Sequence, residues 1–121
     1  MSNKAKQKGT SFETLIKDYL NVVGFADANR TPLQGLGDTG DINGIRNRVT
    51  GQKVAIQCKN QKSFNLSGWL NATVEQAARL DDAVPVLVVK RPGKGKAAVG
   101  DNYVVMRLDD LIELLKDAEF F

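Results

Sequence analysis

Residues 84–90, VPVLVVK, form a continuous apolar run that ends in a lysine. Such a run is typical of a strand in the middle of a sheet whose two faces are both covered. A second run, KVAIQCK at 53–59, begins in the same way but carries Gln57 and Lys59 near its end. Two central strands of this kind, flanked by helical segments, predict a mixed sheet with helices on its faces.

The other segments predict one α/β domain over residues 10–121 with the element order α-β-β-β-α-β-β-α. Residues 1–9 are expected to form a flexible basic tail. In the N-terminal half, we predict a helix from Thr10 that ends at Gly24, a weakly extended stretch at 25–34, and turns at 35–52 that contain a short strand (DINGI) and a hairpin at 47–52. After the 53–59 strand, we predict a helix that is capped by Ser67 and runs to about Asp82. The 84–90 strand is followed by a mobile basic loop at 91–102, a strand at 102–108 and a final helix that begins DDLIELLKD.

Histidine is absent from the 121 residues, and there is one cysteine. This composition excludes Ser-His-Asp triads, Cys-His pairs, His-ligated zinc and an internal disulfide. A metal site would need carboxylate, amide and backbone oxygens, which suit Mg²⁺, Mn²⁺ or Ca²⁺. A single cysteine, a polar N-terminus and no apolar run approaching the ~20 residues of a membrane span predict a cytoplasmic protein without a membrane partner.

The net charge of +3 is unevenly distributed along the chain. Residues 108–121 hold five acidic residues and one basic residue, so residues 1–107 hold sixteen basic and nine acidic residues and carry a net charge of +7. Separate basic patches on a small domain indicate a polyanionic partner, although such charge also serves solubility.

The polar residues of the 53–59 strand suggest a site. Because side chains alternate along a strand, Gln57 and Lys59 share one face, about 6–7 Å apart, while Cys58 lies on the other face. An antiparallel hairpin would return Asp41 to these two residues. An Asp oxygen, an amide oxygen and an ammonium group at one sheet edge can hold a hard cation and a water.

These residues resemble the PD-(D/E)xK nuclease superfamily. The stretches GTSFETLIKDYLNVVGF, GDTGDINGI and VAIQCKNQK are similar to archaeal-type and phage Holliday junction resolvases, and the Q-x-K form is similar to Mrr-like endonucleases. The resemblance covers residues 9–91. It implies a restriction-endonuclease-like αβββαβ core, extended here by a strand and a C-terminal helix. It also implies a Mg²⁺-dependent endonuclease, with Mn²⁺ as a substitute, that cuts four-way DNA junctions as a homodimer. A phage-encoded enzyme of this kind would act in the host cytoplasm.

The resemblance assigns roles residue by residue. Glu13, Asp41, Gln57 and Lys59 match the catalytic positions. The metal ligands would be Glu13, Asp41, Gln57 and the backbone carbonyl of Cys58, while Lys59 would position the attacking water. Gln57 stands where the resolvases usually have Glu, so one negative charge is missing. The candidate DNA-binding residues are Lys4, Lys6, Lys8, Arg30, Arg46, Arg48, Lys62, Lys90, Arg91, Lys94 and Lys96.

Several alternatives stay open. Thr10 to Glu13 is also a capping-box pattern, T-x-x-E, in which Glu13 would cap its own helix. Asp38 is assigned to a turn, Cys58 to the core as a small apolar residue, and Gln76 to the rim of the site. The functional alternatives are an Mrr-like enzyme acting on duplex DNA and a DNA-binding protein on a nuclease scaffold that does not cleave.

Overall fold

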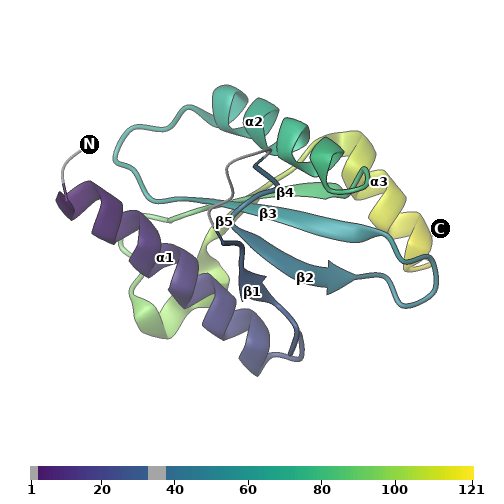
Figure 1. Cartoon of the computed structure of the whole chain (residues 1–121), viewed down its shortest axis with the longest axis horizontal. Helices are drawn as coiled ribbons and strands as arrows, with labels where there is room; N and C mark the ends of the chain where they lie inside the picture. The colour runs from purple at the N-terminus through teal and green to yellow at the C-terminus, as the bar shows by residue number, and fades with distance from the viewer. Residues whose placement is uncertain (1–2, 33–37) are drawn as a thin grey trace.

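The computed structural model of the chain describes residues 3–32 and 38–121 (Figure 1). The predicted turns at 35–37 and the end of the extended stretch at 33–34 lie outside the described residues. The elements are α1 (Asn3–Val22), β1 (Asn29–Arg30), β2 (Ile42–Arg46), β3 (Lys53–Lys59), α2 (Leu66–Arg79), β4 (Val84–Val89), the 3-10 helix η1 (Lys96–Asp101), β5 (Tyr103–Val105) and α3 (Leu108–Asp117).

The strands form one mixed five-stranded sheet in the order β1-β2-β3-β4-β5. β3 and β4 are parallel, and the other neighbouring pairs are antiparallel. The predicted α/β class, the element order and the two central strands are therefore confirmed. The crossover from β3 to its parallel neighbour passes through α2, as parallel pairing requires.

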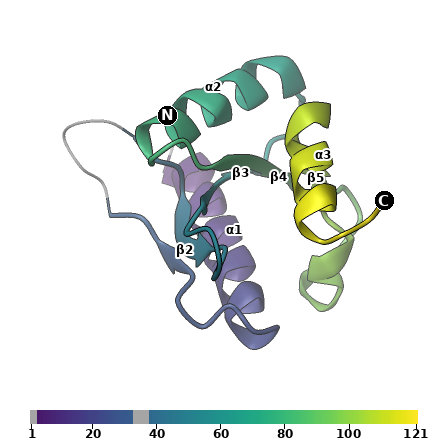
Figure 2. The same ribbon diagram turned by 90° about the vertical axis from the view of Figure 1, so that its right-hand side faces the viewer.

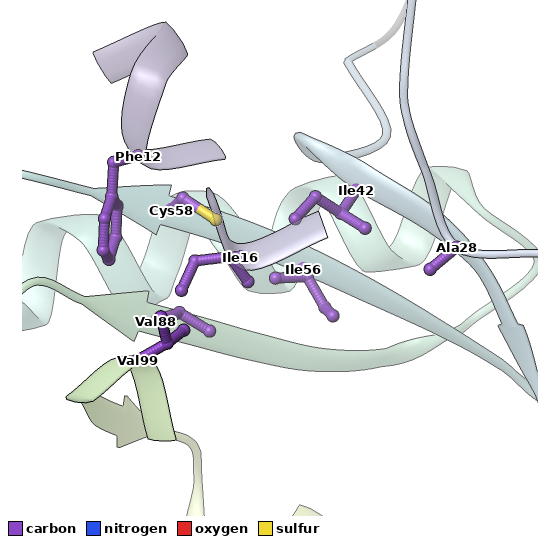
Figure 3. Close-up of a cluster of buried hydrophobic side chains, with 8 residues drawn as sticks. All are labelled: Phe12, Ile16, Ala28, Ile42, Ile56, Cys58, Val88 and Val99. Carbon is purple, nitrogen blue, oxygen red and sulfur yellow. The ribbon is translucent and has the colours of Figure 1, made fainter. Parts of the chain in front are cut away.

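The two faces of the sheet are covered by different helices, with α1 on one side and α2 on the other (Figures 1 and 2). On the α1 side, Phe12 and Ile16 pack with residues of the sheet and of η1. Figure 3 shows this cluster, whose other members are Ala28, Ile42, Ile56, Cys58, Val88 and Val99. On the α2 side the buried cluster consists of Ala55, Ala77 and Ala83, and such small residues let α2 lie close to the sheet.

Helix α1 begins at Asn3, so the predicted flexible tail is wrong for residues 3–9. Thr10 lies inside the helix and cannot be its N-cap, which removes the capping-box role of Glu13. The segment NKAKQK contains mostly good helix formers, and the cap-like pattern at Thr10 concealed this propensity.

Two other boundaries differ from the predictions. The N-cap of α2 is Asn65, whose side chain accepts a hydrogen bond from the Gly68 amide at 3.1 Å, and the helix ends at Arg79. The predicted basic loop is only partly a loop, because residues 96–101 form η1 and bury Val99 against the α1 side of the sheet. Among the described residues, no helix is long and apolar enough to span a membrane.

Candidate active site

Asp41 lies directly before β2 and is held against β3 by two hydrogen bonds. Its amide donates to the carbonyl of Ile56 at 2.8 Å. Its carboxylate oxygen Oδ2 accepts from the amide of Cys58 at 2.9 Å. The register that pairs Ile42 with Ile56 confirms that the hairpin returns Asp41 to the end of β3.

A glycine makes this close approach possible. Gly40 has a φ of +101°, and a Cβ atom there would lie 3.1 Å from the carbonyl oxygen of Ile56. A residue with a side chain would be strained in this left-handed conformation and would push the loop away from β3. Gly40 therefore allows the backbone conformation that places Asp41 against β3.

Glu13 reaches the same place from helix α1. Its carboxyl is close enough to that of Asp41 for the two groups to share a hydrogen bond. On its other side, Glu13 forms an ion pair with Arg30 of β1, with 3.0 Å between Oε2 and Nη2. The Glu13 side chain is only 21% exposed, so this ion pair both orients and partly neutralises it. This contact between Arg30 and Glu13 was not predicted.

The pKa of Asp41 is raised from 3.8 to about 7, chiefly because its carboxyl is buried. The amide of Cys58 opposes this shift, while the neighbouring carboxyls of Glu13 and Asp38 add to it. A cation bound between the Asp41 and Glu13 carboxyl groups would reduce the repulsion that contributes to this shift.

Gln57 is buried, with 8% of its surface exposed. Its amide oxygen Oε1 has no hydrogen-bond partner among the described residues. An unpaired buried amide oxygen is costly unless something binds it. Gln57 lines the same hollow as Glu13, Asp41 and Lys59, and this hollow has a volume of about 700 Å³.

Lys59 and Cys58 complete the end of β3. Lys59 lies at the hollow with its side chain partly exposed, and it forms no ion pair within the described part of the chain. The Cys58 carbonyl leaves the strand on the same side as its amide, toward Asp41. Its thiol points into the core beside Phe12 and Ile16 (Figure 3), where burial raises the pKa of the thiol. This burial agrees with the prediction that Cys58 is a small apolar residue.

The available donors fit a hard divalent cation. Residues 3–32 and 38–121 contain no group of three or more His, Cys, Asp or Glu side chains placed to hold a metal ion. What the site offers is two carboxyl groups, the free amide oxygen of Gln57 and a backbone carbonyl. Mg²⁺ is commonly bound by one or two carboxylates, and water and substrate phosphate fill its other positions.

Asp38 and Gln76 form a second polar contact behind the site. The Asp38 carboxylate accepts hydrogen bonds from the Gly40 amide and from Gln76 Nε2, both at 2.9 Å. The first contact is the predicted turn. The second was missed, because Gln76 is buried at 6% exposure and does not lie at a rim. Its spacing from Thr73 and Ala77 on the buried stripe of α2 was the available signal.

The predicted DNA-binding residues fall into separate groups. Lys6, Lys8, Arg30 and Lys62 line the hollow that contains the site. Arg46 and Arg48 line another hollow, of about 870 Å³, at the far end of the β2–β3 hairpin. Lys94 pairs with Asp101 at 3.7 Å, and Lys90 Nζ binds the carbonyl groups of Arg91 and Lys94.

Comparison with protein families and with curated protein sequences gives no assignment for the chain. No protein-family model matches it, and no curated protein sequence matches it. Its function is therefore inferred from the chemistry of Glu13, Asp41, Gln57 and Lys59.

Proposed function

We propose that the protein is a divalent-metal-dependent DNA endonuclease that acts on four-way junctions, as the resemblance to Holliday junction resolvases implies. One observation carries the proposal. The carboxyl groups of Glu13 and Asp41, which come from different elements, lie side by side at a hollow that also contains Gln57 and Lys59. The element order helix, three strands, helix and strand supports it, because this is the order of a restriction-endonuclease-like core.

The chemistry would be hydrolysis of a phosphodiester bond by water. A Mg²⁺ ion in such a site polarises a phosphoryl oxygen and lowers the pKa of a bound water. Asp41 and Glu13 would hold the ion, with Gln57 Oε1 and the Cys58 carbonyl as neutral donors. The ammonium group of Lys59 would orient the attacking water and stabilise negative charge that develops on the phosphate.

The surroundings of the site suit a DNA backbone. Lys6 and Lys8, one helical turn or more before Glu13, line the hollow together with Lys62 after β3. Contacts with phosphates from such lysines give affinity that is independent of sequence and decreases with salt. A junction would present this backbone from several directions.

A junction enzyme must make two symmetric cuts, so we propose a homodimer with two-fold symmetry. Helix α3 offers a surface for it. None of its residues is buried, and Leu108, Leu111, Ile112 and Leu115 form one exposed apolar stripe at helical spacing. Such a stripe is normally covered by another element or another chain.

The test is incubation of the protein with a synthetic four-way junction and, separately, a linear duplex in Mg²⁺. We expect nicking of the junction, and loss of nicking with retained binding in Lys59→Ala. Lys53→Ala is the matched control, since Lys53 lies at the other end of β3 and pairs with exposed Asp81. If neither DNA is nicked in Mg²⁺ or Mn²⁺, the endonuclease proposal fails.

A second candidate function is DNA binding without cleavage, and Gln57 favours it because an amide replaces a carboxylate. In that case Lys59→Ala would lower DNA affinity only slightly and no nicking would be seen in either protein. Preference for linear duplex over the junction at equal salt would instead indicate an Mrr-like duplex endonuclease.

A further inference from the structure

Three aromatic side chains gather at the surface just beyond the candidate site. The Phe64 ring centroid lies 6.0 Å from that of Trp69 and 6.3 Å from that of Tyr103. The guanidinium carbon of Arg91 lies 5.5 Å from the centroid of the Tyr103 ring. Phe64 and Tyr103 are each 41% exposed, so these rings are not simply part of the core.

The pairing of the sheet places this cluster beside Lys59. Lys59 pairs with Val89 in β4, and Val89 pairs with Tyr103 in β5. Directly paired residues share a face of the sheet, so the side chains of Lys59 and Tyr103 project from the same side. Two strand spacings separate their Cα atoms by about 10 Å.

The two connections around the cluster are basic, although Asp101, two residues before Tyr103, pairs with Lys94 of the second connection. Residues 59–66, which connect the end of β3 to α2, and residues 89–97, which follow β4, contain six basic residues and no acidic residue. Partly exposed rings in a basic region, with Arg91 over one of them, differ from an apolar subunit contact, which is depleted in charge. They match the combination of stacking surfaces and cations that binds unpaired nucleic acid.

We propose that Phe64, Trp69, Tyr103 and Arg91 form a base-stacking surface for an unpaired segment of a DNA strand. This inference rests on the proposed nucleic-acid function and adds a substrate feature, namely that bases beside the cut strand are unstacked from their neighbours. The half-exposed Phe64 and Tyr103 rings would stack on bases, Arg91 would contribute a cation beside them, and Lys62 would contact the adjoining phosphates.

Trp69 is the only tryptophan in the chain, so its fluorescence reports directly on this surface. The metal-free full chain is titrated with oligothymidylate and with an abasic oligomer of the same length. We expect quenching of Trp69 by oligothymidylate and at least about fivefold tighter binding of it than of the abasic oligomer. Equal affinity for the two oligomers in the unmodified protein would overturn the proposal without any variant.

Variants of the aromatic residues then test whether base binding takes place at this surface. Tyr103→Ala and Phe64→Ala should reduce the preference for bases several-fold, whereas Tyr103→Phe should retain it. Val104→Ala is the matched control, because Val104 is exposed and alternates to the opposite face of β5. If Tyr103→Ala instead changes the oligomeric state and leaves base binding intact, the surface is a subunit contact and the proposal is wrong. Tighter binding of oligouridylate than of oligothymidylate would overturn the assignment to DNA.

Nicking of the synthetic four-way junction in Mg²⁺ separates this inference from the proposed function. Nicking without base-dependent binding would contradict the proposed stacking surface and would still support the proposed endonuclease activity. Base-dependent binding without nicking would support the surface and contradict cleavage.

Discussion

Asp41 is positioned by the backbone of β3 through its own amide and through one carboxylate oxygen. Glu13 is positioned by the ion pair with Arg30 and by the packing of the adjacent Phe12 in the core. The two carboxyls therefore come together through independent contacts, and neither can move away to relieve the repulsion. Such preorganised donors are what the proposed cation binding requires.

The raised pKa of Asp41 leads to a pH dependence of stability in the metal-free protein. Unfolded Asp41 loses its proton near its ordinary pKa of 3.8, whereas folded Asp41 keeps the proton up to about pH 7. Between these values the folded state binds more protons, so this group lowers the free energy of unfolding as pH rises, by up to about 1.4 kcal/mol per pH unit. Urea unfolding in EDTA should show this decline, and it should be absent from Asp41→Asn. A decline of equal size in the variant would contradict the assignment.

The same carboxyl makes cation binding depend on pH. Because Asp41 must lose its proton to bind a metal, apparent affinity for Mn²⁺ should rise as pH increases through about 7. Isothermal titration between pH 6 and 8 measures this rise. Affinity that does not change across this range would place the metal elsewhere.

Gln57 supplies a direct test of the missing charge. In Gln57→Glu we expect about tenfold tighter binding of Mg²⁺, since a third carboxylate is added beside Asp41 and Glu13. The metal-free variant should be less stable than the unmodified protein, because the new charge is buried among acids. Gln52→Glu, at the exposed position before β3, is the control and should change neither property. Weaker Mg²⁺ binding in Gln57→Glu would show that Gln57 does not face the cation.

At the scale of elements, the β2–β3 hairpin is shaped by a bulge. Ile42 pairs with Ile56 and Ile45 with Val54, so β2 contains one extra residue between these pairs. Gly44 occupies the bulge with a φ of +99°, and a Cβ there would lie 2.0 Å from the carbonyl oxygen of Asp27. The bulge thus depends on glycine and on close contact with the loop before β1.

We expect Gly44→Ala to lower the free energy of unfolding by about 2 kcal/mol or more, since both backbone strain and a backbone clash result. Gly9→Ala is the matched control. Gly9 lies inside α1 with open space around it, so alanine should stabilise the protein by about 0.5–1 kcal/mol. Denaturant unfolding of both variants measures these changes. A destabilised Gly9→Ala would contradict the helical start of α1.

Alternation along β3 and the turn after Arg46 were enough to predict that Asp41, Gln57 and Lys59 converge. They could not predict the bulge at Gly44, because one unpaired residue in β2 hardly changes the hydrophobic pattern. The contact between Glu13 and Arg30 could not be predicted from the sequence either, because it depends on how α1 packs across the two-residue strand β1. Local sequence patterns determine which face of a strand a side chain occupies and the order of the elements along the chain. Contacts between side chains that are distant in the sequence form only in the assembled sheet.

For the whole molecule, α3 lies at the opposite side of the sheet from β1 and has no buried residue (Figure 1). Its apolar stripe is separated from the site, so association through α3 would leave the hollow open. Two subunits joined there would present two sites to one junction.

If the proposed dimer forms through α3, Leu111→Asp should convert it to a monomer without loss of fold, because the charge is placed in the exposed stripe. Analytical ultracentrifugation measures the molecular mass, and circular dichroism verifies folding. Glu113→Gln, on the opposite side of α3, should leave the dimer unchanged. A monomeric unmodified protein at micromolar concentration would contradict the proposed interface.

The parallel pairing of β3 with β4 has a consequence for the order in which the molecule folds. Val54 pairs with Val84, thirty residues later, whereas the β2–β3 hairpin joins neighbours across a short loop. Hairpins close within microseconds, and contacts between distant residues are reached more slowly. Asp41 and Cys58 should meet early, while Glu13 should arrive only when α1 docks on a sheet that includes β4. The acidic pair would then exist only in the finished protein, so a nascent chain would not yet contain the proposed cation site.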